Sequence, residues 1–160
     1  GGRSREQRLT IIKDSRIGTY GALALAFSLA LRIALLASLP VPIAAAALVA
    51  AHSIGRAGVT AGMTLLPYGG NLDTAKLDYP QQRLSIAGVV ITLAFTMLGF
   101  GVLLALAPWS ALLGAVLAVL LATLPILAAQ KLLGGYTGDI LGATEQMAEI
   151  GLLLGVAALI

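Results

Sequence analysis

A nine-residue segment beginning at position 13, K-D-S-R-I-G-T-Y-G, places charged and hydroxyl side chains directly before a long apolar run. Lys13 and Arg16 are cations that suit phosphate oxygens, and Asp14 is a carboxylate that suits a hard metal ion. Ser15 and Tyr20 add hydrogen-bond donors. Polar groups of both charge signs at the start of an apolar helix predict a site for a phosphorylated substrate at a membrane face.

A second group of ionisable residues lies inside two later apolar runs. On a helical wheel Asp139, Gln146 and Glu149 share an arc, with Glu145 at its edge. Arg56 lies at a depth similar to that of Glu149 in an earlier run, which allows these two to pair. Charged groups within a membrane span are costly, and each is therefore a functional hypothesis.

The composition limits the metal chemistry. The chain has no cysteine and one histidine, which excludes thiolate sites and histidine clusters. A metal must then be a hard cation such as Mg²⁺ held by oxygen ligands, for which Asp14 and Asp139 are the candidates. Ser15 and Thr137 are expected to cap helices, and the glycine-rich turn at 134–139 to point backbone N–H groups at an anion.

These residues must be positioned by membrane helices. The chain is 59% hydrophobic and 11% charged, with a mean hydropathy of +0.97, too few charges to cover the surface of a soluble domain. Apolar runs of about 20 residues cross a bilayer. We predict an all-α fold, a polytopic transmembrane bundle forming a single domain, with about five spans at 17–39, 43–66, 84–107, 109–133 and 138–160.

The basic residues predict the orientation. All eight that lie in loops or at the N-terminal end fall on one side: Arg3, Arg5, Arg8, Lys13, Arg16, Lys76, Arg83 and Lys131. By the positive-inside rule this side is cytoplasmic, with the N-terminus inside and the C-terminus outside. The turns at 40–42 and 107–108 are uncharged and tight, so we expect successive helices to be antiparallel neighbours. Small residues four apart, at Gly58/Gly62, Gly138/Gly142 and Gly151/Gly155, favour close packing.

Each charged group also has a structural interpretation. Lys13 and Arg16 can be anchors at the membrane surface, and Arg56 with Glu149 can be a structural ion pair. Asp139 can be a favourable charge at a helix start. A structural role is favoured for five others: Arg32 snorkelling to the outer end of its span, His52 packing, and Arg3, Arg5 and Arg8 solvated.

Three segments resemble one known family. K-D-S-R-I-G-T-Y-G, with the preceding G-G-R-S-R-E-Q-R-L, resembles the cobalamin synthase (adenosylcobinamide-GDP ribazoletransferase) family. G-G-Y-T-G-D-I-L-G-A-T-E-Q-M-A-E, at 134–149, is similar to the closing motif of that family, and L-L-P-Y at 65–68 matches a feature between them. The resemblance covers essentially all 160 residues.

The resemblance implies a multi-span enzyme of the cytoplasmic (inner) membrane of bacteria or archaea. Such enzymes join α-ribazole or its 5′-phosphate to adenosylcobinamide-GDP, releasing GMP and requiring Mg²⁺; the product is adenosylcobalamin or its 5′-phosphate. The partners implied are these substrates and the lipid bilayer, and not nucleic acid. A homo-oligomer or an assembly with other corrin-pathway enzymes is left open.

One feature of the family is missing. Its members carry an acidic motif, roughly D-G-L-A-D-x-x-D-G, directly before the segment that matches Gly1-Gly2, where this chain begins. We therefore expect a fragment of a longer protein that is inactive alone. The roles that follow are these: phosphate contacts by Lys13 and Arg16, metal ligation by Asp14 with the upstream aspartates, a second metal or substrate contact by Asp139, positioning or proton transfer by Glu145 and Glu149, Arg56 to hold them, and hydrogen bonds from Ser15 and Tyr20.

Two other functions fit the residues. The first is another membrane phosphotransferase that acts on a nucleotide-activated substrate. The second is a transporter subunit in which Arg56, Glu149 and His52 line a solute path. Against transport, the polar groups crowd one face and the outer half carries little beyond Arg32.

Overall fold

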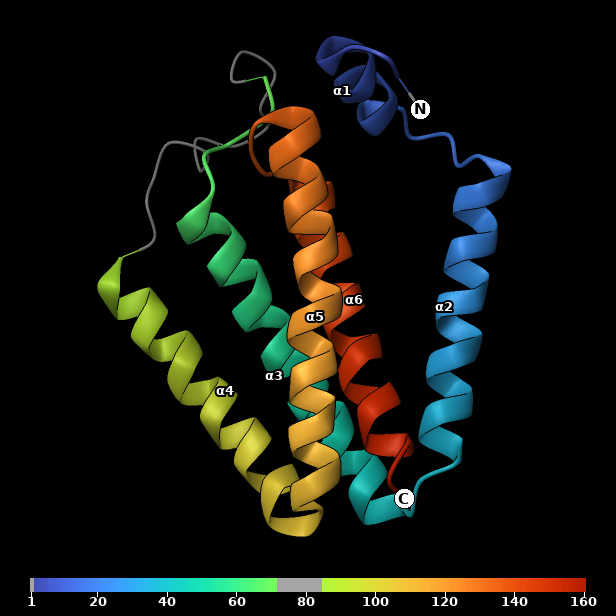
Figure 1. Cartoon of the computed structure of the whole chain (residues 1–160), viewed down its shortest axis with the longest axis vertical. Helices are drawn as coiled ribbons and strands as arrows, with labels where there is room; N and C mark the ends of the chain where they lie inside the picture. The colour runs from blue at the N-terminus through green and yellow to red at the C-terminus, as the bar shows by residue number, and fades with distance from the viewer. Residues whose placement is uncertain (1, 72–84) are drawn as a thin grey trace.

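The computed structural model describes residues 2–71 and 85–160, in which the regular structure is helical apart from one isolated bridge. The helices are α1 Arg5–Lys13, α2 Thr19–Ala37, α3 Val41–Leu65, α4 Ile86–Leu106, α5 Pro108–Leu133 and α6 Gly138–Ala157 (Figure 1). All except α1 are long and apolar enough to cross a membrane. The predicted all-α bundle with five spans is confirmed, and the helix ends lie within three residues of the predicted ones.

Local sequence explains where the helices begin and end. Pro40 precedes α3 and Pro108 opens α5, positions where a missing N–H costs no helical hydrogen bond. Ser85 caps α4 by accepting a hydrogen bond from the Gly88 N–H at 3.1 Å. Gly134 ends α5 with a φ of 76°, the left-handed conformation that glycine adopts without strain.

The helix α1 was not predicted from the sequence. Ser4 and Gln7 form a reciprocal capping box at its start, in which each side chain bonds the backbone of the other. The nine residues after Ser4, Arg5–Lys13, form a polar helix without buried residues. It lies beside the end of α5 (Figure 1).

The most extensive packing is between α5 and α6, followed by α3 with α6 and α3 with α4. Two of the three predicted glycine pairs lie in these contacts. A Cβ on Gly155 would come within 2.5 Å of Gly114 in α5, and one on Gly62 within 2.9 Å of Leu141 in α6. The third prediction is wrong, because Gly138 and Gly142 face open space.

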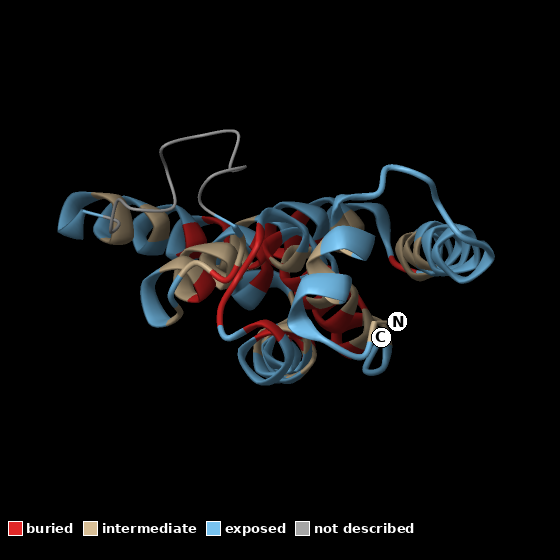
Figure 2. Cartoon of the chain, turned by 90° about the horizontal axis from the view of Figure 1, so that it is seen from above, coloured by how far each residue is buried: buried red, intermediate tan, exposed pale blue. Residues whose placement is uncertain are grey.

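The helix α2 stands apart from the other spans (Figures 1 and 2). None of its residues is buried. Leu35 and Leu36, near its end, are partly buried against the core cluster. The helix packs more with α6 than with α3, so the expectation that every successive pair would be close neighbours is wrong here. A tight turn fixes the end of a hairpin but does not hold its two arms together.

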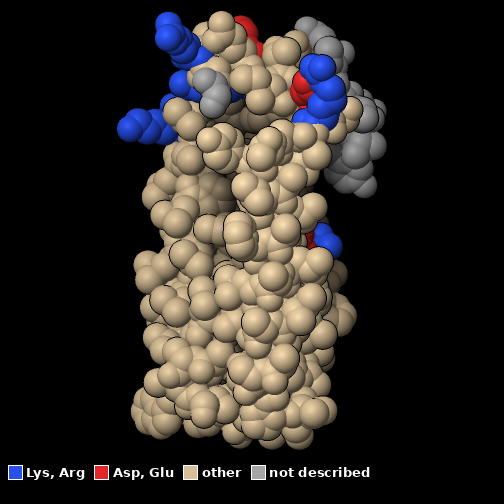
Figure 3. All heavy atoms as spheres, turned by 90° about the vertical axis from the view of Figure 1, so that its right-hand side faces the viewer, with Lys and Arg blue, Asp and Glu red and all other residues tan. Residues whose placement is uncertain are grey.

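Most of the charged side chains on the face drawn in Figure 3 gather at one end of the molecule, and a smaller charged group lies further along it. That end carries α1, the connection from α1 to α2, the end of α5 and the start of α6, whereas the turns between α2 and α3 and between α4 and α5 lie at the other (Figure 1). Lys76 and Arg83 lie outside the described residues. The gathering agrees with the charge asymmetry of the sequence, and which side is cytoplasmic stays a prediction.

Candidate functional site at the charged end

Two motif segments run side by side at the charged end. The Gly69 N–H donates to the Tyr136 carbonyl at 2.7 Å, and the Tyr136 N–H donates to the Pro67 carbonyl at 2.9 Å. Tyr68 and Tyr136 form the parallel bridge, and their rings meet edge to face with centroids 5.6 Å apart. The end of α3 is therefore joined to the turn between α5 and α6.

This pairing requires glycine at two positions. A Cβ on Gly135 would lie 2.2 Å from the Pro67 carbonyl oxygen, and a Cβ on Gly69 would lie 2.6 Å from the Gly135 carbonyl oxygen. Neither contact is possible, so any larger residue would separate the two segments. Tyr136 is buried in the contact, and burial, with a smaller contribution from Tyr68, raises the pKa of its hydroxyl.

Arg5 connects this pairing to α1. Its Nε donates to the Leu133 carbonyl and its Nη2 to the Gly69 carbonyl, both at 2.9 Å. The last carbonyls of a helix lack intrahelical donors and carry partial negative charge, which a guanidinium satisfies. Arg5 is exposed, as expected for a solvated residue, but its side chain also holds α1, the end of α5 and the segment after α3 together.

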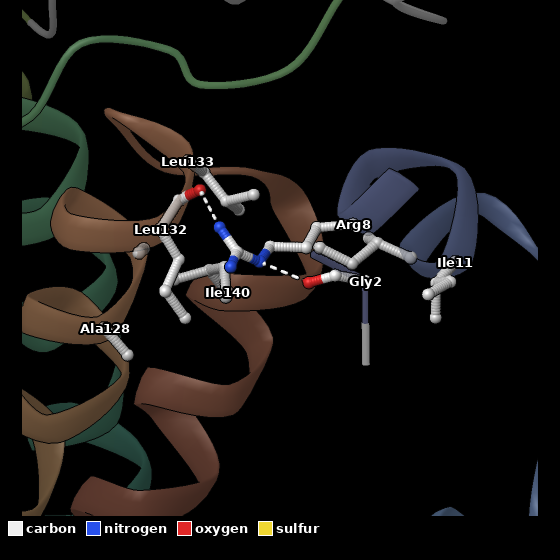
Figure 4. Close-up of a pocket in the computed structure, with 9 residues that line it drawn as sticks. Gly2, Arg8, Ile11, Ala128, Leu132, Leu133 and Ile140 are labelled. Carbon is white, nitrogen blue, oxygen red and sulfur yellow. Dashed lines mark hydrogen bonds between the residues drawn. The ribbon is translucent and has the colours of Figure 1, made fainter. Parts of the chain in front are cut away.

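Arg8 makes a similar contact one turn later. Its Nη1 donates to the Leu132 carbonyl at 3.2 Å and its Nε to the Gly2 carbonyl at 2.9 Å (Figure 4). It borders a cavity of about 230 Å³ between α1, the end of α5 and Ile140. Sequence reasoning missed both contacts, and the signal for them was the i, i+3 spacing of Arg5 and Arg8, which places both on one helix face.

The Lys13–Tyr20 segment is exposed. Arg16 forms an ion pair with Asp14, with Nη2 and Oδ2 2.8 Å apart, and its backbone N–H donates to Oδ1 at 3.0 Å. These hydrogen bonds hold the pKa of the Asp14 carboxyl below its ordinary value and raise the pKa of Arg16. Tyr20 is 91% exposed.

The expected helix caps turned out differently at the two positions. Ser15 does not cap α2, which begins at Thr19 after Gly18 with no side-chain cap. The expectation for Thr137 is confirmed, since its hydroxyl accepts a hydrogen bond from the Ile140 N–H at 3.4 Å. The difference arises because residues 14–18 form no regular structure, so α2 begins four residues after Ser15.

The glycine-rich turn is committed largely to the protein itself. The Gly134 N–H donates to the Gln130 carbonyl and the Tyr136 N–H to the Pro67 carbonyl, so neither points at an anion as expected. The first turn of α6 still offers the N–H groups of Gly138 and Asp139, which have no acceptor within the helix. The Asp139 side chain there is exposed.

The carboxylates at this end suit a hard cation in part. Among the described residues, no three of the types histidine, cysteine, aspartate and glutamate come together as a metal cage. Mg²⁺ is usually held by one or two carboxylates together with substrate phosphates. Asp14 and Asp139, both exposed and both on segments at the charged end, match that smaller ligand set in chemistry.

The ionisable groups at membrane depth pair differently from the prediction. Arg56 Nε lies 3.1 Å from Glu145 Oε1, not beside Glu149. Glu149 instead contacts the His52 Nδ1 at 2.7 Å and Arg32 Nη1 at 2.5 Å, and its side chain is 3% exposed. The pairing of Arg56 with Glu149 that the similar depths allow does not form, because Arg56 pairs with Glu145.

The packing of α3 on α6 explains this register. A Cβ on Gly55 would lie 3.0 Å from Glu145 Cγ and 3.3 Å from Glu149 Cγ, so the glycine lets both glutamates contact α3. Because the helices are antiparallel, Arg56 meets Glu145 and His52 meets Glu149. Arg32 was expected to snorkel outward, but it turns inward from α2 because the carboxylate of Glu149 lies within its reach.

The chain was also compared with known proteins. A family model described as cobalamin-5-phosphate synthase matches residues 1–157. Curated relatives named adenosylcobinamide-GDP ribazoletransferase include those of Bradyrhizobium diazoefficiens (44% identical over 99% of this chain), Azorhizobium caulinodans (40% over 98%) and Leptothrix cholodnii (40% over 95%). The chain spans 59–60% of the length of these relatives. No solved structure matches it significantly.

Proposed function

The chain belongs to the cobalamin-5-phosphate synthase family, and we propose that the intact protein is a membrane transferase that joins α-ribazole, or its 5′-phosphate, to adenosylcobinamide-GDP. The observation that carries the proposal is the match of the family model over residues 1–157. The curated relatives of this name, at 37–44% identity for the first six, support the same assignment. The charged end supports it independently, because it gathers cations and carboxylates on exposed segments.

The proposed reaction is a substitution at phosphorus. A hydroxyl oxygen of α-ribazole attacks the corrin-side phosphorus of the diphosphate, and a new P–O bond forms. The bond from that phosphorus to the bridging oxygen breaks, GMP leaves with the bond's electrons, and the hydroxyl proton passes to a base. Such a reaction depends mainly on alignment and on neutralisation of the phosphate charge.

The Lys13–Tyr20 segment is proposed to bind the phosphates. Arg16 exchanges its Asp14 partner for phosphate oxygens, Lys13 adds a second cation, and Ser15 and Tyr20 donate hydrogen bonds. The exposure of the ion pair supports this exchange, since an exposed pair contributes little stability and is easily broken.

We propose Mg²⁺ as the cofactor, with Asp14 and Asp139 as the ligands that this chain contributes. Release of Arg16 to the substrate would free the Asp14 carboxylate for this role. When bound, the ion would supply positive charge to the diphosphate oxygens and so favour departure of GMP.

The charges at membrane depth are proposed to support the site. Arg56 holds Glu145, which is 16% exposed and is the one proposed for proton transfer. Glu149 is proposed to position α2 and α3 relative to α6, because its two carboxylate oxygens are in ion pairs with Arg32 and His52.

The location proposed is the cytoplasmic (inner) membrane, with the charged end on the cytoplasmic side. The asymmetry of basic residues supports this orientation. It places the phosphate-binding segment where a nucleotide-activated substrate is available.

The test is release of GMP by membranes that contain the intact protein. With adenosylcobinamide-GDP, α-ribazole and Mg²⁺, we expect GMP and a corrinoid phosphodiester in equal amounts, and neither product when α-ribazole is omitted. Turnover of a nucleotide-activated lipid but not of the corrinoid would overturn the substrate and favour another phosphotransferase. Solute flux in proteoliposomes without diphosphate cleavage would overturn the enzyme and favour a transporter.

A further inference from the structure

The half of α2 that follows the Lys13–Tyr20 segment is exposed along its whole length. Every residue from Asp14 to Phe27 is exposed, and α2 contains no buried residue at all. Its apolar contact with the core comes later, at Leu35 and Leu36. At 1.5 Å per residue, the start of α2 lies roughly 25 Å along the helix from that contact.

Arg32 makes the polar contacts of α2 with α6. Its Nη1 pairs with Glu149 Oε2 at 2.5 Å, and its Nη2 donates to the Gln146 carbonyl at 3.4 Å. The Arg32 side chain is 19% exposed and that of Glu149 is 3% exposed. Both partners on the other side belong to α6, the helix whose first turn carries Asp139.

The environment makes this contact difficult to break. A charge at membrane depth is costly unless it is paired, so separating Arg32 from Glu149 would leave a guanidinium among apolar side chains. His52 contacts the other carboxylate oxygen of Glu149 and joins α3 to the same cluster. The carboxylate is thereby held from one side by α3 and from the other by α2.

We infer that Arg32 is a positioning residue: by clamping α2 to Glu149 of α6, it sets where the Lys13–Tyr20 segment lies relative to the start of α6. Without the clamp, α2 is anchored to the core by the apolar contact of Leu35 and Leu36, and the exposed connection at residues 14–18 joins its other end to α1. A small rotation at Leu35 and Leu36 then displaces the start of α2 within the reach of that connection. The catalytic meaning of that position rests on the proposed function, but the clamp itself does not.

A distance measurement tests the clamp without any turnover. The chain has no cysteine, so spin labels can be attached at Gly18→Cys and Gly142→Cys, both positions where a Cβ meets open space. Any other cysteine of the intact protein is replaced, and the labelled protein is placed in lipid nanodiscs. Pulsed electron paramagnetic resonance then measures the distance between the label at the start of α2 and the label on α6. We expect one narrow distance distribution for the background protein, at least twofold broadening in Arg32→Met, and recovery of most of the narrow distribution in Arg32→Lys.

Two controls make the result specific. Arg56→Met breaks a charge pair of the same kind between α3 and α6, helices that pack extensively, and should leave the distribution unchanged. A second label pair, Leu65→Cys with Gly142→Cys, reports the α3–α6 bundle and should not respond to Arg32→Met.

The outcomes separate the clamp from the proposed function. An unchanged distribution in Arg32→Met and in Glu149→Gln would overturn the inference, as would equal broadening of the bundle pair in both variants, which would indicate general loss of the fold. Broadening confined to the first pair would support the clamp even where the intact protein released no GMP. That last result would count against the proposed reaction alone.

Discussion

Two ion pairs of similar geometry lie in opposite environments in this protein. Asp14 and Arg16 pair at 2.8 Å in an exposed connection, where both charges remain in contact with solvent. Glu149 and Arg32 pair at membrane depth, where the carboxylate is 3% exposed. The first can exchange partners at little cost, and the second cannot. Similar contacts therefore serve binding in one region and architecture in another, according to whether water can replace the partner.

The largest expected effect comes from the buried pair. Glu149→Gln leaves Arg32 without a compensating charge and should lower the free energy of unfolding by about 3 kcal/mol. The free energy of unfolding is measured by titrating the protein in mixed micelles with SDS. The matched change in the exposed pair, Asp14→Asn, should leave the unfolding midpoint unchanged, and equal effects of the two variants would remove the distinction between the pairs.

The next effect in size is expected at Arg5, which holds the charged end by hydrogen bonds to backbone carbonyls and not by a buried ion pair. Arg5→Met removes two charged hydrogen bonds to the Leu133 and Gly69 carbonyls, a local loss of about 2 kcal/mol. We expect at least tenfold faster amide hydrogen exchange in α1 and no change in α4. Arg3→Met, on the same exposed segment, serves as the control, and equal exchange rates in the two variants would contradict the role given to Arg5.

The backbone pairing of the two motif segments gives an effect of similar or smaller size. Gly135→Ala would place a Cβ 2.2 Å from the Pro67 carbonyl oxygen and should cost about 2 kcal/mol. Gly138→Ala, where a Cβ meets open space, should change stability by less than about 0.5 kcal/mol. Thermal unfolding compares the two variants, and a tolerated Gly135→Ala would mean that the segments are not in contact.

The smallest expected effect is the titration of the exposed pair. Because Arg16 lowers the pKa of Asp14 in the folded state, the stabilisation that this carboxylate provides is present above its unfolded pKa and is lost as pH falls through the folded pKa. The pair should therefore be insensitive to pH near neutrality and respond only in acid, below the ordinary range for aspartate. Carboxyl NMR shifts should show the Asp14 midpoint rising towards its ordinary value in Arg16→Gln, and an unmoved midpoint would contradict the pairing.

Much of the fold could be predicted from the sequence because membrane spans follow from apolar runs and their proline boundaries. Residues 138 and 133 each mark a helix end in the prediction and in the structure. The helix α1 could not be predicted in this way, because it is short and polar and depends on Arg5 and Arg8 reaching the end of α5. Its capping box at Ser4 and Gln7 was the one local signal.

The candidate site could be predicted in residue type but not in pairing. The sequence indicates that Arg56 and two glutamates lie at similar depths, yet the partner depends on the register of α3 against α6, which Gly55 sets by close approach. The inward turn of Arg32 depends on where α2 lies, and no local pattern encodes that. The contact of Pro67 with Gly135 likewise joins segments far apart in sequence and follows only from packing.

The proposed site is tested most directly by the turnover of Asp14→Asn in the intact protein, measured as Mg²⁺-dependent GMP release from adenosylcobinamide-GDP. We expect at least a hundredfold loss of turnover with unchanged unfolding, while Glu6→Gln, a matched change at an exposed acid on α1, keeps full activity. Full Mg²⁺-dependent turnover by Asp14→Asn would contradict the proposed role of Asp14 as a metal ligand.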